Sequence, residues 1–273
     1  MYCNLLITKL KYIIMYNSLQ QIEVFHLEFL RWFGRKADPK HYALKGGVNM
    51  RFFFGSIRYS EDMDLDLSDM RVEVLQDIVL KILITQTFIY NLRPYGIQRV
   101  SIPDMAKAKQ TETTQRFKIH LTTFAGEDLF TKIEFSRRSM KDGILVHSVL
   151  DSILRTYKLI PLIVPHYDAL STTIQKIIAL ASRPVVQARD IFDLYILSPQ
   201  YTSSEIIESK NLKKDKIEKA YENLFSVTFE QYRDRVVSFL PPDEQVIYGT
   251  TLFWDEIKLK VASLIEGLMN KYG

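Results

Sequence analysis

Six residues alternate strictly between aspartate and an apolar side chain, in the segment "DMDLDL" at 62–67. Because successive side chains of a strand point to opposite faces of its sheet, this alternation predicts a strand. Met63, Leu65 and Leu67 would face the core, with the three aspartates on the other face. Aspartate is depleted in strands, and like charges on one face repel each other. The segment is therefore either an edge strand protected by charge or a strand whose carboxylates bind a cation.

A glycine pair precedes this strand. "HYALKGG" predicts a short strand or turn that runs into Gly46 and Gly47, and "VNMRFFFG" predicts a short buried helix after them. Backbone N–H groups at such a turn can hold a phosphate at the helix N-terminus. Alone, the pair is typical of an ordinary turn, and Lys45 is equally well a solvated lysine or a phosphate contact. A phosphate cradle, a helix and paired carboxylates in this order indicate a nucleotide-handling site.

Strand patterns are confined to the first part of the chain, and helical patterns dominate the rest. Helices are predicted at about 19–33 and 71–92, and a hairpin from "QRFKIHLTTF" (115–124) and "DLFTKIEFS" (128–136). After "KLIPLIVPHYD", helices are predicted at about 171–182, 188–197, 203–225, 228–239 and 251–269. The prediction is an α+β fold. A domain at 17–160, with a mixed sheet flanked by helices, precedes a helical bundle at 161–273.

Composition is typical of a soluble globular protein. The 273 residues are 47% hydrophobic, and the net charge of +4 permits a polyanionic partner without arguing for one. A single cysteine excludes internal disulfides, the five histidines lack zinc-site spacing, and a reducing cytoplasm fits best. "MYCNLLITKLKYIIM" is interrupted by lysines and far shorter than a membrane span. We therefore expect no membrane contact, and interpret residues 1–16 as an N-terminal extension, with Met15 as an alternative start.

Two blocks of the sequence resemble the AbiEii/AbiGii type of nucleotidyltransferase toxins, of the polymerase-beta-like nucleotidyltransferase superfamily. The first block of that family is Lys-Gly-Gly, a short apolar helix, and Arg-x-Ser-Glu-Asp-x-Asp. Here its residues are Lys45, Gly46, Gly47, Arg58, Ser60, Glu61, Asp62 and Asp64. The second is a lysine, an arginine one or two turns later, and Arg-Asp-x-x-Asp-Leu on the next helix. Here its residues are Lys176, Arg183, Arg189, Asp190, Asp193 and Leu194.

The chain departs from the family pattern at two places. Val48 replaces the small hydroxyl residue that often follows the glycines. The acidic residue often found shortly before the lysine is missing from "STTIQK". Neither departure affects the paired aspartates.

The resemblance implies that Asp62 and Asp64 bind the catalytic Mg²⁺ or Mn²⁺. It leaves Asp66 as an auxiliary or solvated residue, which we expect to tolerate alanine. Such folds usually have a third carboxylate on a neighbouring strand, as metal ligand or general base. Glu134 fits, because it shares the polar face of its predicted strand with Lys132. The alternative for Glu134 is an exposed glutamate paired with that lysine.

The nucleotide's phosphates are expected to contact Lys45, Gly46, Gly47, Arg58, Ser60, Lys176 and Arg183. Lys176 would reach the site from the helical bundle, although a surface lysine is the alternative. Asp190 is expected in the catalytic set, where it would orient Lys176 or a substrate hydroxyl. Arg189 and Asp193 have the spacing of a local helix salt bridge. "KAKQTETTQRFK" (107–118) is either an RNA-facing or a solvated loop.

The activity implied by this resemblance is metal-dependent transfer of a nucleoside monophosphate from a nucleoside triphosphate to an acceptor hydroxyl, with release of pyrophosphate. The implied acceptor is tRNA, and the implied partner is a cognate antitoxin protein. Two alternatives remain at this point. The acceptor is a protein or a small molecule, or the chain is a catalytically silent binding module of the same fold, for which the missing acid before Lys176 is the only hint.

Overall fold

The computed structural model of the protein describes residues 16–105, 110–137, 140, 142–200, 206 and 212–272. Fifteen of the sixteen residues of the expected N-terminal extension lie outside this part of the chain, as do Lys107, Ala108 and Lys109 of the candidate RNA-facing loop. No described helix is both long and apolar enough to cross a membrane.

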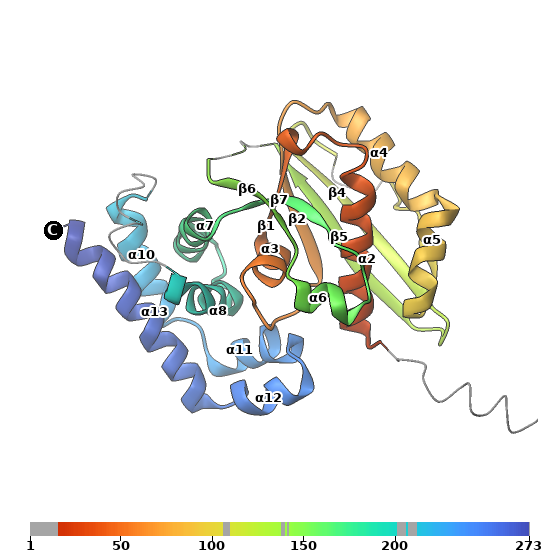
Figure 1. Cartoon of the computed structure of the whole chain (residues 1–273). Helices are drawn as coiled ribbons and strands as arrows, with labels where there is room; N and C mark the ends of the chain where they lie inside the picture. Colours follow the sequence, from red (N-terminus) through yellow and green to blue (C-terminus); the bar gives the residue numbers. More distant parts are fainter. Residues whose placement is uncertain are drawn as a thin grey trace, which may run out of the picture.

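Seven strands form one mixed sheet, in the order β3-β4-β5-β2-β1-β7-β6 (Figure 1). β2 is central, antiparallel to β1 and parallel to β5. The strands predicted around residues 42, 62, 115 and 128 are confirmed, whereas β3, β6 and β7 were not predicted. The bounds are β1 (Tyr42–Lys45), β2 (Asp62–Leu67), β3 (Ile97–Ser101), β4 (Thr114–Thr123), β5 (Asp128–Ser136), β6 (Ile144–Ser148) and β7 (Ile163–Tyr167).

In the described part of the chain, five α-helices accompany the sheet and six form the C-terminal part. Helix α2 begins at Ser18 because the Asn17 side chain accepts a hydrogen bond from the Gln20 N–H. The helix predicted at 71–92 is interrupted at Thr85, whose backbone is extended. The helices are α2 (Ser18–Phe33), α3 (Gly46–Phe53), α4 (Val72–Ile84), α5 (Gln86–Leu92), α6 (Asp151–Thr156), α7 (Ala169–Ser182), α8 (Ala188–Leu197), α10 (Lys214–Leu224), α11 (Phe229–Arg235), α12 (Pro242–Tyr248) and α13 (Thr251–Tyr272).

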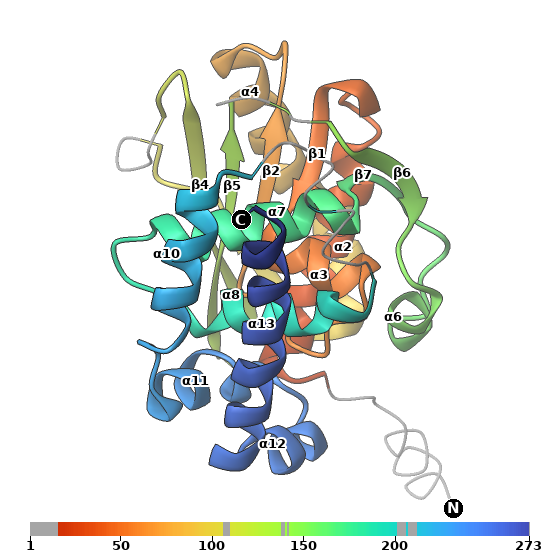
Figure 2. The same cartoon turned by 90° about the vertical axis from the view of Figure 1, so that its left-hand side faces the viewer.

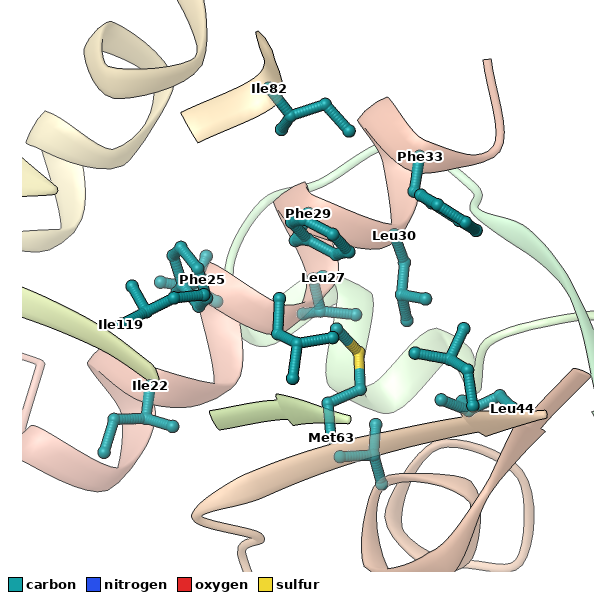
Figure 3. Packing of buried hydrophobic residues seen from close by; sticks show 14 of the residues in the cluster. Ile22, Phe25, Leu27, Phe29, Leu30, Phe33, Leu44, Met63, Ile82 and Ile119 are labelled. Carbon is teal, nitrogen blue, oxygen red and sulfur yellow. The ribbon is translucent and has the colours of Figure 1, made fainter. Parts of the chain in front are cut away.

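The protein has two hydrophobic cores. In the first, α2 packs its apolar side chains, among them Phe25, Phe29 and Leu30, into one cluster with Met63 of β2 (Figure 3). The second lies among α7, α8, α10 and α13, with Trp254 and Ile177 fully buried in it. These helices stand in front of the opposite sheet face (Figure 2). Helices therefore cover both faces of the sheet, with α2 on one face and the C-terminal helices on the other.

The change from mixed to helical structure falls later than predicted. Strand β7 pairs with β1 and β6, so residues 163–167 belong to the sheet and not to the bundle. The bundle begins at α7, where the Asp168 side chain accepts a hydrogen bond from the Ser171 N–H. We therefore move the proposed boundary from residue 160 to Asp168. The prolines that suggested the earlier position flank or lie within β7, on the outer part of the sheet.

Candidate active site

The alternation in β2 separates the core from a pocket. Met63 and Leu65 are fully buried on the α2 side, whereas Asp62 and Asp64 are half-buried on the face towards the bundle. The pocket has a volume of about 340 Å³. It brings together every residue that the sequence predicts as a metal ligand or phosphate contact. It is lined by Lys45, Gly46, Gly47, Arg58, Ser60, Asp62, Asp64, Arg116, Lys132, Glu134, Lys176, Arg183 and Arg189.

The three carboxylates of the pocket differ in their partners. Lys132 Nζ lies 2.7 Å from Asp62 Oδ2, and Arg116 Nε donates a 2.7 Å hydrogen bond to Glu134 Oε2. Asp64 lies opposite Glu134 in the β2–β5 register, yet its carboxylate forms no hydrogen bond or ion pair with any described residue. Burial raises the pKa of Asp64, and the nearby Lys45 opposes this shift. A negative charge on Asp64 is therefore the least compensated of the three.

The carboxylates have the chemistry of divalent-cation ligands, but they do not form a complete site. Among the described residues, no three Asp, Glu, His or Cys side chains lie close enough to hold a metal ion by themselves. The predicted set of Asp62, Asp64 and Glu134 is not assembled, because two of its members are turned towards cationic side chains. Mg²⁺ commonly takes only one or two carboxylates, with phosphate oxygens and water as its other ligands. Asp64 offers one such carboxylate directly, whereas Asp62 is paired with Lys132 in this structure.

The predicted strand-to-helix turn is confirmed at Gly46 and Gly47. Gly46 has φ +70°, and a Cβ atom there would lie 2.9 Å from Asp64 Oδ2. A Cβ atom on Gly47 would lie 2.6 Å from Ser60 Oγ. No side chain caps the helix that begins here, so its first N–H groups remain available. The turn therefore brings uncapped backbone donors directly beside the carboxylates.

Arg58 is a buried cation in the pocket wall. Only 5% of the residue is exposed, and its guanidinium donates one 3.1 Å hydrogen bond to the Tyr59 carbonyl. It forms no ion pair within the described part of the chain. Burial lowers the pKa of Arg58, while Asp193 acts in the opposite direction. A buried guanidinium without a counter-ion is costly unless an anion binds to it, so this wall suits a phosphate.

Lys176 reaches the pocket from α7, as the sequence predicts. Its Nζ lies 2.5 Å from Asp193 Oδ2 and 3.3 Å from Asp190 Oδ1, and both carboxylates are fully buried. Arg183 Nε lies 2.9 Å from the other oxygen of Asp190. Asp190 lies behind the pocket wall and does not line the pocket. From this position its carboxylate can orient both Lys176 and Arg183. The alternative Arg189–Asp193 salt bridge is absent from the described residues, and Arg189 lines the pocket instead.

Of the two alternatives for Asp66, an auxiliary or a solvated residue, the solvated one is wrong. The residue is only 6% exposed. Its carboxylate accepts hydrogen bonds from the Lys45 ammonium and from the Tyr167 hydroxyl, the latter at 2.8 Å. Asp66 therefore anchors Lys45 and joins three strands across the sheet.

Sequence reasoning missed three cations of the pocket: Arg116, Lys132 and Arg189. Arg116 lies opposite Glu134 in the β4–β5 hairpin, a pairing that hairpin register would have indicated. The contact of Lys132 with Asp62 depends on the parallel β2–β5 pairing, which no local pattern indicates. With them, seven cationic side chains face three carboxylates in the pocket. This excess of positive charge matches a polyphosphate ligand.

Triphosphate chemistry explains both signs of charge in this pocket. Carboxylates can hold a cation against a phosphoryl group, while the glycine turn and the cations can hold the remaining phosphates. The protein is a nucleotidyltransferase. Its sequence matches the family model described as nucleotidyl transferase AbiEii toxin, type IV toxin–antitoxin system, over residues 28–263. The chain therefore belongs to the AbiEii nucleotidyltransferase toxin family, and the resemblance seen in its two sequence blocks is confirmed.

Solved structures share this fold. MenT4, a nucleotidyltransferase toxin from Mycobacterium tuberculosis, aligns with a TM-score of 0.59 and 14% identity, over 93% of this chain and 84% of its own. JHP933 from Helicobacter pylori aligns with a TM-score of 0.55 and 16% identity, over 94% of both chains. A putative nucleotidyltransferase from H. pylori gives the same TM-score and identity, over 94% of this chain and 97% of its own. A search of curated proteins found no match.

Proposed function

We propose that the protein transfers a nucleoside monophosphate from a nucleoside triphosphate to a hydroxyl of tRNA, in a reaction that requires Mg²⁺ or Mn²⁺. The observation that carries this proposal is the uncompensated carboxylate of Asp64 beside the turn of Gly46 and Gly47 and the unpaired guanidinium of Arg58. A cation site and an anion site that share one pocket suit a metal–triphosphate complex.

The cationic wall divides into fixed and movable groups. Lys176 and Arg183 are held by buried carboxylates, so they would offer positive charge to the phosphates with little loss of side-chain entropy. Lys45 is also held, by Asp66. Arg58 has no such partner and would gain the most from a phosphate. Lys132 and Arg116 pair with the pocket's own carboxylates and would have to exchange partners when the substrate binds.

In the transfer, an acceptor oxygen forms a new bond to the α-phosphorus while the bond from that phosphorus to the bridging oxygen breaks. Pyrophosphate leaves, and the hydroxyl proton moves to a carboxylate. Glu134 is the proposed base, because it lies beside Asp64 on the neighbouring strand and is half-buried in the same pocket. A divalent cation on Asp62 and Asp64 would offset the negative charge of the phosphates. Release of Glu134 from Arg116 is then part of the activation of the acceptor.

Transfer to tRNA would make the chain the toxin of its toxin–antitoxin pair and place the reaction in the cytoplasm. The family supports a toxin that uses a nucleoside triphosphate and is restrained by an antitoxin. The acceptor rests on the resemblance of the two sequence blocks. Nucleotidylation of a protein or a small molecule remains the competing outcome of the test.

The test incubates purified protein with Mg²⁺ or Mn²⁺, each α-labelled nucleoside triphosphate, and either bulk tRNA or a protein lysate. We expect label on tRNA, with its loss in Asp62→Ala and Asp64→Ala. The control is Asp77→Ala, since this exposed carboxylate lies on α4 and pairs only with Lys81. Label on protein would redirect the proposal to another acceptor. If no nucleotide is transferred or bound, the proposed reaction fails.

A further inference from the structure

We propose that a hollow beside the catalytic pocket binds the terminal nucleobase of the acceptor strand. In this assignment the Phe130 ring is the stacking surface and Lys118 contacts the adjoining phosphate. The inference rests on the proposed transfer to a nucleic acid, and it names the part of the site that holds the acceptor.

The hollow lies next to the catalytic pocket. The hollow has a volume of about 610 Å³ and shares Asp62 and Lys132 with the catalytic pocket. It extends from that pair in the direction of β3 and β4, whereas the glycine turn and the bundle cations lie on the other side. Its position therefore leaves the triphosphate side of the pocket free.

The hollow contains an exposed aromatic platform. Phe130 is 69% exposed although it lies on a regular strand, and one face of its ring stacks on His120. The two ring centroids are 4.8 Å apart and the planes differ by 12°. Asp128 Oδ1 lies 2.6 Å from His120 Nε2 and fixes that ring. The outer face of Phe130 is thus a rigid π-surface open to solvent, which stacks on a base of any sequence.

The remaining walls combine apolar residues with charged ones, among them Glu61, Asp104 and Lys118. Ile102, which is 60% exposed, and Pro103 supply an apolar wall. Lys118 is exposed, lies opposite Lys132 in the β4–β5 register, and forms no ion pair within the described part of the chain. A base held on aromatic and apolar walls, with a phosphate beside a lysine, is the usual arrangement for single-stranded nucleic acid.

The spacing along β5 indicates that the bound nucleobase belongs to the acceptor strand and not to the incoming triphosphate. Phe130, Lys132 and Glu134 alternate on one face, so each lies about 6.6 Å from the next. A nucleotide stacked on Phe130 would have its sugar near Lys132 and Asp62, and its hydroxyl directed towards Glu134, the proposed base. The incoming triphosphate would approach from the opposite side, at Gly46 and Gly47.

Binding is measured by fluorescence anisotropy of a short labelled single-stranded RNA, without nucleoside triphosphate or metal. We expect Phe130→Ala to weaken binding by roughly 5- to 150-fold, the range for loss of one stacked base, and Phe130→Trp to retain it. Phe130→Leu keeps an apolar side chain without a π-face, and should bind as weakly as the alanine variant. The matched control is Phe225→Ala, because this phenylalanine is 51% exposed and lines neither the hollow nor the catalytic pocket. Lys118→Ala should reduce the slope of log affinity against log salt by about 0.7, the value for one phosphate of a single strand.

Kinetics then distinguish the acceptor from the triphosphate. Phe130→Ala should raise the KM for tRNA and leave the KM for the nucleoside triphosphate unchanged. A raised KM for the triphosphate with unchanged RNA affinity would overturn the acceptor assignment. Unchanged RNA affinity in both the alanine and leucine variants would overturn the stacking site itself. If the wild-type protein transfers no label to RNA, the proposed function fails, but the anisotropy measurement still decides whether this hollow binds a nucleobase.

Discussion

Replacement of Asp66 tests two opposed expectations. The sequence predicts that this aspartate tolerates alanine, whereas the structure shows that it holds Lys45 and Tyr167. Asp66→Ala removes the acceptor of the Tyr167 hydroxyl and the buried partner of Lys45. A lost hydrogen bond to a charged group costs about 1.5–3 kcal/mol, and a broken buried ion pair costs about 3–5 kcal/mol. Because the Lys45 side chain is 27% exposed, water compensates part of the second loss. We expect the free energy of unfolding to fall by about 2–4 kcal/mol.

The assay is urea unfolding of the wild type, Asp66→Ala, Asp66→Asn and Tyr167→Phe. The asparagine variant keeps the shape of the side chain, so it should lose about half as much stability as alanine. The double variant Asp66→Ala, Tyr167→Phe should show a coupling energy of about 1 kcal/mol, because each change removes one partner of the same hydrogen bond. Asp77→Ala should change stability by less than about 0.5 kcal/mol, since its pair with Lys81 is exposed.

The transfer activity of Asp66→Ala provides a second test of the role of Asp66. Lys45 lies opposite Asp64 in the β1–β2 register, so a lysine released from Asp66 can turn towards the free carboxylate of Asp64. Asp66→Ala should therefore raise the divalent-metal concentration required for half-maximal transfer. If Asp66→Ala unfolds with the wild-type midpoint and needs no more metal, the sequence expectation of a replaceable aspartate was right and the anchoring role is wrong.

Three further predictions concern other parts of the molecule. Gly47→Ala should weaken nucleoside triphosphate binding at least tenfold with a smaller loss of stability, because its Cβ would lie 2.6 Å from a hydroxyl oxygen; calorimetric titration tests this. Asp193→Asn should lower kcat and cost about 2–4 kcal/mol of stability, since it removes the carboxylate 2.5 Å from Lys176; unchanged values for both would refute the anchoring of that lysine. Burial lowers the pKa of His26 to about 3 and that of His166 to about 4, from 6.5. The unfolded chain therefore binds protons that the native protein refuses, and stability falls as the pH drops below 6.5, by about 2 kcal/mol for each histidine at pH 5. Equal urea midpoints at pH 7.5 and pH 5 would contradict this.

Local sequence patterns predicted the parts of the site that depend on one strand or one turn. The period of two in β2 assigned Met63 to the core and Asp64 to the opposite face, and the structure confirms both. The position of Gly46 before a helix predicted the strand-to-helix turn. This prediction also depends on local sequence, because neighbouring residues set the backbone conformation there. The strands β3, β6 and β7 were missed, since each has only five residues and is bordered by turn residues or prolines that mask a period of two.

The sequence by itself determined the class of fold, the alternation in β2 and the glycine turn, because each is a local pattern of spacing and chemistry. Its resemblance to a known family singled out Asp62, Asp64 and Lys176. Only the tertiary structure decided which charges meet. Lys132 contacts Asp62 across 70 residues of sequence, and β7 brings Tyr167 to Asp66 across 101. Such pairings depend on strand order, which long-range packing selects and local periodicity does not encode. Asp62, Asp64 and Asp66 have the same period in the sequence, and their neighbours in the sheet make two of them pocket carboxylates and the third an anchor.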